Sequence, residues 1–399
     1  MTLIVLIALS AAPVLKIGDV QAVEILQTLW LALAAPAFLY RGMRVPYSWR
    51  GYALFLGLCL ALSAVALRLP FYPPLETGFL KQPGLLSLAR IFELSLAICF
   101  MLIVARLLAR RRALLRLALD AYCAIGVLSA WVSLAAWALA RGAGIETFPV
   151  YGDGARLRGF FNEGGPYGVY LVSVAVTVLL RARLMGRARN AALVSLGAAL
   201  FLSGSKAGVL AAACLCGIGA AVTGSRARRI AVLGSCAAVL AIFLALFQGR
   251  MYGYMYSYLN FDEVLVYRPG DPSLIMGRIA AALIVPRMIA AHPLVGIGAG
   301  NYSLMRNDPV YLQGLPPVDD WDLAGMGLFG SAAEFGLPLT VFLLALLLRP
   351  LIAARKRRAP AIVAVAAGFQ PLAFLLGVNL NFFYPWLVGA LVIAAESEC

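Results

Sequence analysis

The sequence predicts an all-α polytopic membrane protein, with about twelve transmembrane helices and one large loop outside the membrane. Of its 399 residues, 63% are hydrophobic and only 13% are charged. Long apolar runs follow one another, and several approach the roughly 20 residues that a helix needs to cross a bilayer. They lack the alternation of apolar and polar residues that is typical of barrel strands. We therefore expect helices, rather than a barrel, to span the membrane.

The apolar runs define twelve candidate spans, several of them short. They are centred on residues 3–15, 22–40, 51–69, 84–108, 114–140, 166–180, 191–203, 207–222, 230–247, 325–348, 361–376 and 382–395. The first run lacks the basic segment and the cleavage site of a signal peptide, so we expect it to be retained as a helix. The weakest division is Gly204-Ser205-Lys206, which we interpret as a tight turn between two helices. The chain is thus divided into residues 1–247, a loop over 248–324, and residues 325–399.

The basic residues indicate the orientation of these spans. The formal net charge is +15, but Lys and Arg are spread through short loops, a distribution that argues against a nucleic-acid partner. The loops after even-numbered spans carry 20 of the 33 Lys and Arg residues. Because such residues are enriched in cytoplasmic loops, both termini are predicted in the cytoplasm and the 248–324 loop in the periplasm.

Cysteine usage predicts neither disulfides nor a metal site. The seven cysteines lie mostly inside apolar runs, and Cys214 and Cys216 have no second ligand pair. We interpret them as small hydrophobic side chains. No metal and no cofactor are expected.

The loop over 248–324 is the long interval that cannot lie in lipid. It holds seven of the 18 acidic residues and the only histidine. Four tyrosines at alternate positions, from Tyr252 to Tyr258, match the period of a strand, although tyrosines at the end of a span are more typical of an interfacial belt. Residues 273–291 are predicted as an amphipathic helix. On this helix Arg278 and Arg287 would face opposite ways unless Pro286 breaks it.

Five cations near predicted helix ends on the outer face are candidate substrate-binding residues. They are Arg156, Arg158, Lys206, Arg278 and Arg287. Arginine forks and lysine point charges recognise phosphate in a partly dry site. For a single outer arginine, the alternative is snorkelling to lipid headgroups. Lys206 is the best candidate because it lies between two apolar runs with only small residues beside it.

Carboxylates are candidate bases, because one that lies within hydrogen-bond reach can take the proton of a sugar hydroxyl. Glu163 precedes the 166–180 span, and Asp322 ends the cluster Asp319-Asp320-Trp321-Asp322. Trp321 amid acids suits sugar stacking, and a solvated turn explains the cluster equally well. Both readings stay open.

Two further positions have mainly structural interpretations. His292 precedes a proline and a glycine-rich turn, so we expect it to support the loop geometry or to contact substrate, rather than to act as the essential base. Arg90 and Glu93 are three residues apart within a span and are expected to pair on one helix face.

Four elements in this order resemble the O-antigen polymerase and O-antigen ligase superfamily of bacterial membrane glycosyltransferases. They are Arg158-Gly159-Phe160-Phe161-Asn162-Glu163, in the form seen in exopolysaccharide polymerases; Ser205-Lys206-Ala207-Gly208, with lysine where the family has arginine; Arg278 followed by His292-Pro293-Leu294-Val295-Gly296-Ile297-Gly298-Ala299-Gly300-Asn301; and Glu334-Phe335-Gly336-Leu337-Pro338. Together they extend from Arg156 to about Leu348.

The resemblance implies a GT-C-like architecture in the bacterial inner membrane, with the site facing the periplasm. It implies a metal-independent, inverting transfer of a sugar chain from undecaprenyl diphosphate to an acceptor hydroxyl. Lys206 and Arg278 would take the positions of the diphosphate-binding cations. The partners would be an undecaprenyl-diphosphate-linked oligosaccharide, membrane lipid and, for a polymerase, a chain-length regulator protein.

One departure from the family bears on the reaction. Ligases of the superfamily carry a catalytic histidine shortly before the Glu-x-Gly element, where this chain has about Gly325. A polymerase is therefore favoured, with Asp322 or Glu163 as the base. A ligase that transfers the glycan to lipid A-core is the nearest alternative. A flippase of the same lipid-linked substrate is another, although transporters usually show inverted repeats and the sequence shows none.

The orientation can be tested by cysteine labelling in a background without the native cysteines. An impermeant reagent added from the periplasmic side should label Gln313→Cys, and should label Lys356→Cys only after the membrane is opened. The opposite pattern would overturn the predicted topology.

Overall fold

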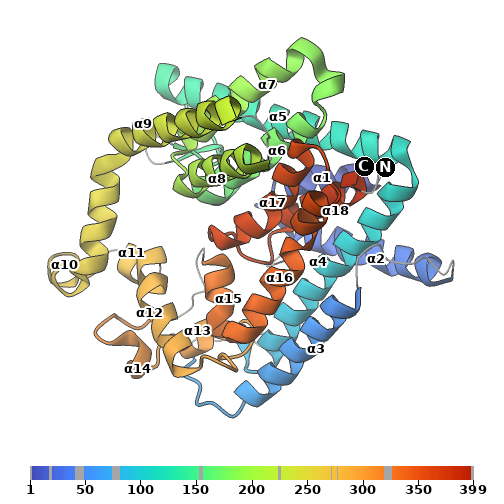
Figure 1. The fold of residues 1–399 in the computed structure, drawn as a ribbon. Helices are drawn as coiled ribbons and strands as arrows, with labels where there is room; N and C mark the ends of the chain where they lie inside the picture. Colours follow the sequence, from blue (N-terminus) through green and yellow to red (C-terminus); the bar gives the residue numbers. More distant parts are fainter. Residues whose placement is uncertain are drawn as a thin grey trace.

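The computed structural model describes residues 2–17, 20–40, 49–73, 81–151, 156–222, 226–270, 272–275, 277–318 and 326–396. These residues are mostly helical (Figure 1), which confirms the helical fold class. Two short antiparallel strand pairs accompany the helices, β1 (Lys16–Ile17) with β2 (Val20–Gln21) and β3 (Val150–Tyr151) with β4 (Arg156–Leu157).

The helices follow the predicted spans closely over most of the chain. They are α1 (Thr2–Ser10), α2 (Ala22–Tyr40), α3 (Trp49–Ala66), α4 (Leu85–Arg110), α5 (Arg112–Ala143), α6 (Gly164–Leu180), α7 (Ala182–Ser203), α8 (Lys206–Val222), α9 (Arg226–Leu259), α10 (Phe261–Tyr267), α11 (Pro272–Ile275), α12 (Arg278–Ala291), α13 (Tyr302–Met305), α14 (Pro309–Leu312), α15 (Gly327–Phe335), α16 (Leu337–Lys356), α17 (Ala361–Leu375) and α18 (Phe383–Glu396).

Among the described residues, four helices are both long and apolar enough to cross a membrane, namely α3, α4, α5 and α16. Shorter apolar helices accompany them, including α6, α8, α17 and α18. This pattern agrees with a multi-pass membrane protein. The number of twelve spans and the periplasmic location of the large loop stay predictions.

Four predicted spans differ from the helices observed. The first helix ends at Ser10 rather than at residue 15, and the seventh begins at Ala182 rather than at residue 191. The run 325–348 is not one helix, because α15 ends at Phe335 and α16 begins at Leu337, with Gly336 between them at a φ of 79°. The ninth span, predicted to end at residue 247, continues as α9 to Leu259. The four alternating tyrosines are therefore helical, and all four are exposed, Tyr252 by 72%. Their alternation does not mark a strand.

The break at Gly336 is explained by the glycine-rich loop that crosses it. Gly298 N–H donates to the carbonyl of Glu334 at 2.9 Å, and Leu337 N–H donates to the carbonyl of Pro293 at 2.8 Å. A Cβ on Gly296 would meet the backbone of Glu334, and a Cβ on Gly336 would meet the backbone of Leu294. Gly296 and Gly336 both have positive φ angles. The two backbones approach so closely that neither position has room for a side chain.

The predicted amphipathic helix is divided into two parts. The short α11 is followed by α12, which begins at Arg278 and continues through Pro286. The buried face of α12 packs against the short helices that follow it in the chain: the residues in contact are Ala281, Ile284, Val285 and Met288 of α12 with Tyr302, Met305, Tyr311 and Leu312. This part of the loop is thus an ordered layer with a small core of its own.

The middle of the bundle is occupied by α18. Nearly all its residues are buried, and it packs against α4 and α17 (Figure 1), as expected for a helix that is apolar all round. Phe161 connects this interior to the chain before α6. Its ring centroid lies 5.3 Å from that of Tyr170 and 6.1 Å from that of Tyr384. The start of α6 is therefore anchored to the central helix.

The glycine crossing yields a prediction about stability. Gly296→Ala and Gly336→Ala should each lower the melting temperature of the detergent-solubilised protein, because each adds a Cβ at a positive φ (about 1–3 kcal/mol) and against backbone. Gly253→Ala in α9 is the matched control, since nothing lies within 4 Å of its Cβ position. An unchanged melting temperature in both variants would contradict the arrangement.

Candidate functional site

Glu163 lies at the start of α6, in a segment whose backbone is held from both sides. The hairpin of β3 and β4 precedes it, and buried Phe161 anchors it to the bundle. Glu163 occupies the position before α6 in extended conformation, and its side chain makes no capping hydrogen bond. Its carboxylate instead accepts a hydrogen bond from the Arg278 guanidinium at 3.1 Å. Two residues that lie 115 positions apart in the chain are thereby joined.

Arg278, the first residue of α12, lies over the start of α6. A Cβ on Gly165 would come within 2.6 Å of its Nη2 atom, so the glycine leaves room for the guanidinium against the first turn of the helix. The ion pair with Glu163 remains solvent-accessible, with side chains 44% and 62% exposed. A ligand anion can therefore reach Arg278.

The turn between α7 and α8 has the predicted form. Gly204 adopts the left-handed conformation and Lys206 is the first residue of α8. The Ser205 hydroxyl donates to the carbonyl of Gly165 at 2.9 Å and accepts from Gly208 N–H at 3.0 Å, so it caps α8 and ties it to α6. Lys206 is exposed, and its Nζ lies 4.2 Å from the ring centroid of Tyr254 on α9. The tyrosine face stabilises the ammonium group.

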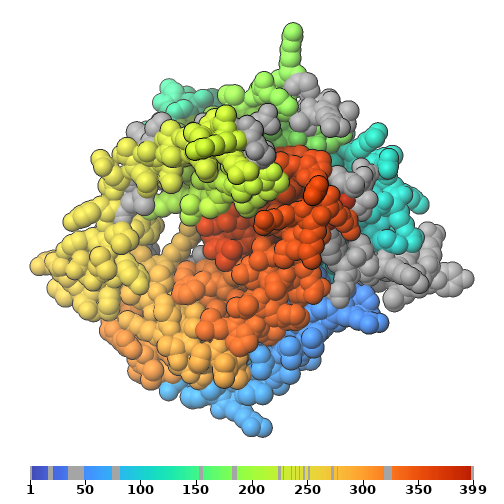
Figure 2. All heavy atoms as spheres, viewed as in Figure 1, coloured from blue at the N-terminus to red at the C-terminus, as the bar shows by residue number. Residues whose placement is uncertain are grey.

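Three helix N-termini therefore meet in one region, those of α6, α8 and α12. A helix N-terminus carries about half a positive charge and favours anions. Here Lys206 and Arg278 stand as the first residues of their helices, opposite to the usual preference. The fields of helices and side chains add, and this is the charge pattern of an anion site. Figure 2 shows the surface hollowed where green α8 and yellow α9 face the orange and red parts of the chain.

The other two cations of the first outer segment support this backbone. Arg156 donates to the carbonyl of Ser203 at 3.1 and 3.2 Å, which satisfies the C-terminal end of α7. Arg158 donates to the carbonyl of Phe148 at 2.8 Å and stacks on the Phe148 ring at 4.2 Å. Both guanidinium groups are thus engaged by backbone carbonyls of the protein itself.

Arg287 and His292 are placed away from Glu163, in the layer formed by α12 to α14. Arg287 donates to the carbonyls of Tyr311 and Leu312 at 2.7 and 2.8 Å, so the two arginines of α12 do face different partners. His292 Nε2 lies 2.9 Å from the Tyr311 hydroxyl. Burial lowers the pKa of His292, which favours the neutral imidazole. These contacts fit the structural interpretation of His292.

Asp322 and Trp321 lie outside the residues that the structure describes, as do Asp319 and Asp320. Within the described ranges, no group of three or more His, Cys, Asp and Glu side chains has the arrangement of a metal site.

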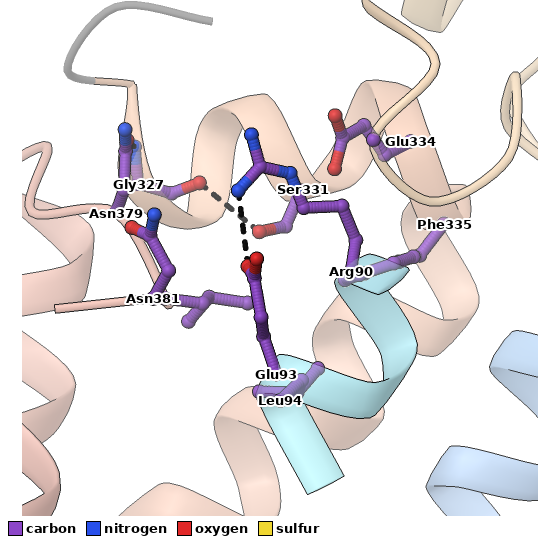
Figure 3. A pocket seen from close by; sticks show the side chains of 11 residues that line it. Arg90, Glu93, Leu94, Gly327, Ser331, Glu334, Phe335, Asn379 and Asn381 are labelled. Atoms are coloured by element: carbon purple, nitrogen blue, oxygen red, sulfur yellow. Dashed lines mark hydrogen bonds and ion pairs between the residues drawn. The ribbon is translucent and has the colours of Figure 1, made fainter. Parts of the chain in front are cut away.

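A second polar cluster lines a pocket between α4, α15 and the loop before α18. Its lining includes Arg90, Glu93, Ser331, Glu334, Asn379 and Asn381. Arg90 and Glu93 form the expected ion pair, at 3.0 Å, and Figure 3 shows the pair inside this pocket. Ser331, Asn379 and Asn381 were not predicted from the sequence. The available signal was Asn379-Leu380-Asn381, two amides between two apolar spans.

The architecture is that of a multi-pass helical membrane protein, with the cations Lys206 and Arg278 at helix N-termini that meet. Residues 191–344 match the family described as O-antigen ligase. This match contains three of the four elements and supports the resemblance to the O-antigen ligase and polymerase superfamily, whose members are glycosyltransferase-like membrane enzymes. The matched segment includes Lys206, Arg278 and Glu334. No curated protein matches the chain.

Proposed function

We propose that this protein polymerises undecaprenyl-diphosphate-linked oligosaccharide repeat units, as in O-antigen, capsule or exopolysaccharide synthesis. It would act at the periplasmic face of the bacterial inner membrane, with 248–324 as the periplasmic loop. The observation that carries the proposal is that the N-termini of α6, α8 and α12 meet. Lys206 is the first residue of α8, and Arg278 is the first residue of α12. A lipid diphosphate is the anion that the family match favours for this site.

The proposed reaction is a metal-independent, inverting substitution. An acceptor hydroxyl oxygen attacks the anomeric carbon of the growing chain, and the bond from that carbon to the diphosphate oxygen breaks. The electron pair leaves with the lipid diphosphate, and the hydroxyl proton passes to a base. Lys206, Arg278 and the helix N-termini would stabilise the charge that develops on the leaving group.

The position of the single histidine in this chain favours a polymerase over a ligase. His292 is the only one, and it is hydrogen-bonded to Tyr311 in the α12 to α14 layer. The position shortly before Glu334 where ligases carry their catalytic histidine is occupied by about Gly325. A carboxylate would then act as the base. Glu163 already accepts a hydrogen bond from Arg278, so we place Asp322 first and Glu163 second.

The function is tested with the purified full-length protein and lipid-linked repeat units in proteoliposomes. Longer chains on the lipid support the proposal. Translocation of the repeat unit without extension would instead place the protein among the transporters. Transfer to lipid A-core without extension would identify a ligase.

Lys206 should be essential for turnover because it neutralises diphosphate charge. Lys206→Ala should lower chain extension by roughly tenfold or more, as expected for loss of a hydrogen bond between charged groups, whereas Lys206→Arg should retain part of the activity. Arg141→Ala, at an exposed cation near the end of α5, is the matched control. Normal extension by Lys206→Ala at normal membrane levels would refute the assignment.

The base is tested with Asp322→Asn and Glu163→Gln at saturating lipid-linked substrate. We expect Asp322→Asn to cause the larger fall in kcat. If Glu163 acts only by holding Arg278, Glu163→Gln should change the KM for the donor more than kcat. Glu263→Gln is the matched control, because this exposed carboxylate bonds Tyr256 on α9. Near-normal turnover in both site variants would exclude a carboxylate base at these positions.

A further inference from the structure

The pocket between α4, α15 and the loop before α18 has the chemistry of a neutral sugar site. It has a volume of about 130 Å³. Arginine and carboxamide donors face carboxylate, hydroxyl and carboxamide acceptors across it (Figure 3). Sugar hydroxyls both donate and accept, so a polyol can use such a mixed lining fully.

The Arg90–Glu93 pair is held in the pocket by the glycine-rich loop. Gly300 has a φ of 71°, and its Cβ position is taken by the aliphatic stem of Arg90. The stem packs on this glycine, and the guanidinium reaches Glu93 at 3.0 Å, with both side chains a little over a quarter exposed. Ionisable side chains within a membrane-spanning helix are costly, and those that occur there mark functional sites.

Asn381 supplies an independent sign that a ligand belongs here. Its Oδ1 is shielded from solvent and has no hydrogen-bond donor within the part of the chain that the structure describes. Such acceptors are rare because burying one without a partner costs free energy. Because Asn381 lines the pocket, a small rotation of its side chain would let a ligand hydroxyl provide the missing donor.

The charge of the lining separates this pocket from the anion site. Glu93 and Glu334 outweigh Arg90, so the pocket carries net negative charge and would repel a diphosphate. The region of Lys206 and Arg278 has the opposite sign. A neutral sugar suits the first and a lipid diphosphate suits the second.

The two regions are nevertheless neighbours. The Phe382 ring, next to Asn381, stacks on Phe161 with centroids 6.5 Å apart, and the Tyr384 hydroxyl donates to the carbonyl of Pro166 at 3.4 Å. The loop that carries the two asparagines therefore lies against the start of α6, where Glu163 and Arg278 meet.

We infer that the Arg90–Glu93 pocket binds the terminal sugar of the acceptor repeat unit and presents its hydroxyl toward the donor at the start of α6. This inference rests on the proposed polymerase function, which makes the bound sugar an acceptor. Sugar binding by the pocket can be measured without turnover.

The experiment uses the full-length protein with two probes. The donor is the lipid-linked repeat unit, and the soluble acceptor is the oligosaccharide that mild acid releases from it. Binding of the oligosaccharide is followed by saturation-transfer NMR, and extension is measured while each substrate is varied. Asn381→Ala and Glu93→Gln are compared with Asp120→Asn. This residue is a matched control because its carboxylate pairs with Arg181 at 2.6 Å and neither side chain lines the pocket.

Asn381→Ala and Glu93→Gln should weaken oligosaccharide binding and raise the acceptor KM by roughly tenfold, with the donor KM unchanged. The control should match the wild type. Wild-type acceptor dependence and binding in both folded variants would overturn the inference. The wild type could also bind the oligosaccharide without extending chains, while the variants lose this binding. That result would support the sugar site and refute the polymerase function.

Discussion

The backbone crossing between the glycine-rich loop and the break at Gly336 is the contact on which the arrangement of the site depends. A helix break leaves carbonyl and N–H groups without partners, and such groups are costly where water is scarce. Here the loop supplies the partners, because Ile297 and Gly298 donate to the last carbonyls of α15 and Pro293 accepts from the start of α16. The glycines at 296 and 336 allow this approach. This backbone crossing fixes the position of α12 relative to α15.

The position of α12 relative to α15 also connects the two polar regions, which are the region of Lys206 and Arg278 and the Arg90–Glu93 pocket. The loop continues from α12, which begins with Arg278, and it lies against α15, which carries Glu334. Further along, Gly300 supports the stem of Arg90. One segment of the chain thus contacts the elements of both the proposed donor site and the proposed acceptor pocket. Their separation is set by backbone hydrogen bonds rather than by flexible side chains, as a transfer between two large substrates requires.

The electrostatics of the proposed donor region run against local preference. Cations at helix N-termini are locally unfavourable, yet Lys206 and Arg278 both occupy such positions. Glu163 and the ring of Tyr254 offset part of this unfavourable charge. An arriving dianion would relieve the rest, so the same repulsion that weakens the empty site strengthens binding of the substrate. Such local conflicts are typical of functional positions.

The sequence by itself determined the helical class, most helix bounds, the turn at Lys206, the Arg90–Glu93 pair and the superfamily. These features depend on apolar runs, spacing of three or four residues, and short motifs, all of which are local. Only the tertiary structure decided the break at Gly336, the engagement of Arg287 by backbone carbonyls, the Glu163–Arg278 pair and the place of Asn379 and Asn381. Each of these is set by contacts between segments far apart in the chain. Their energies come from loop packing and long-range hydrogen bonds, which no local pattern specifies.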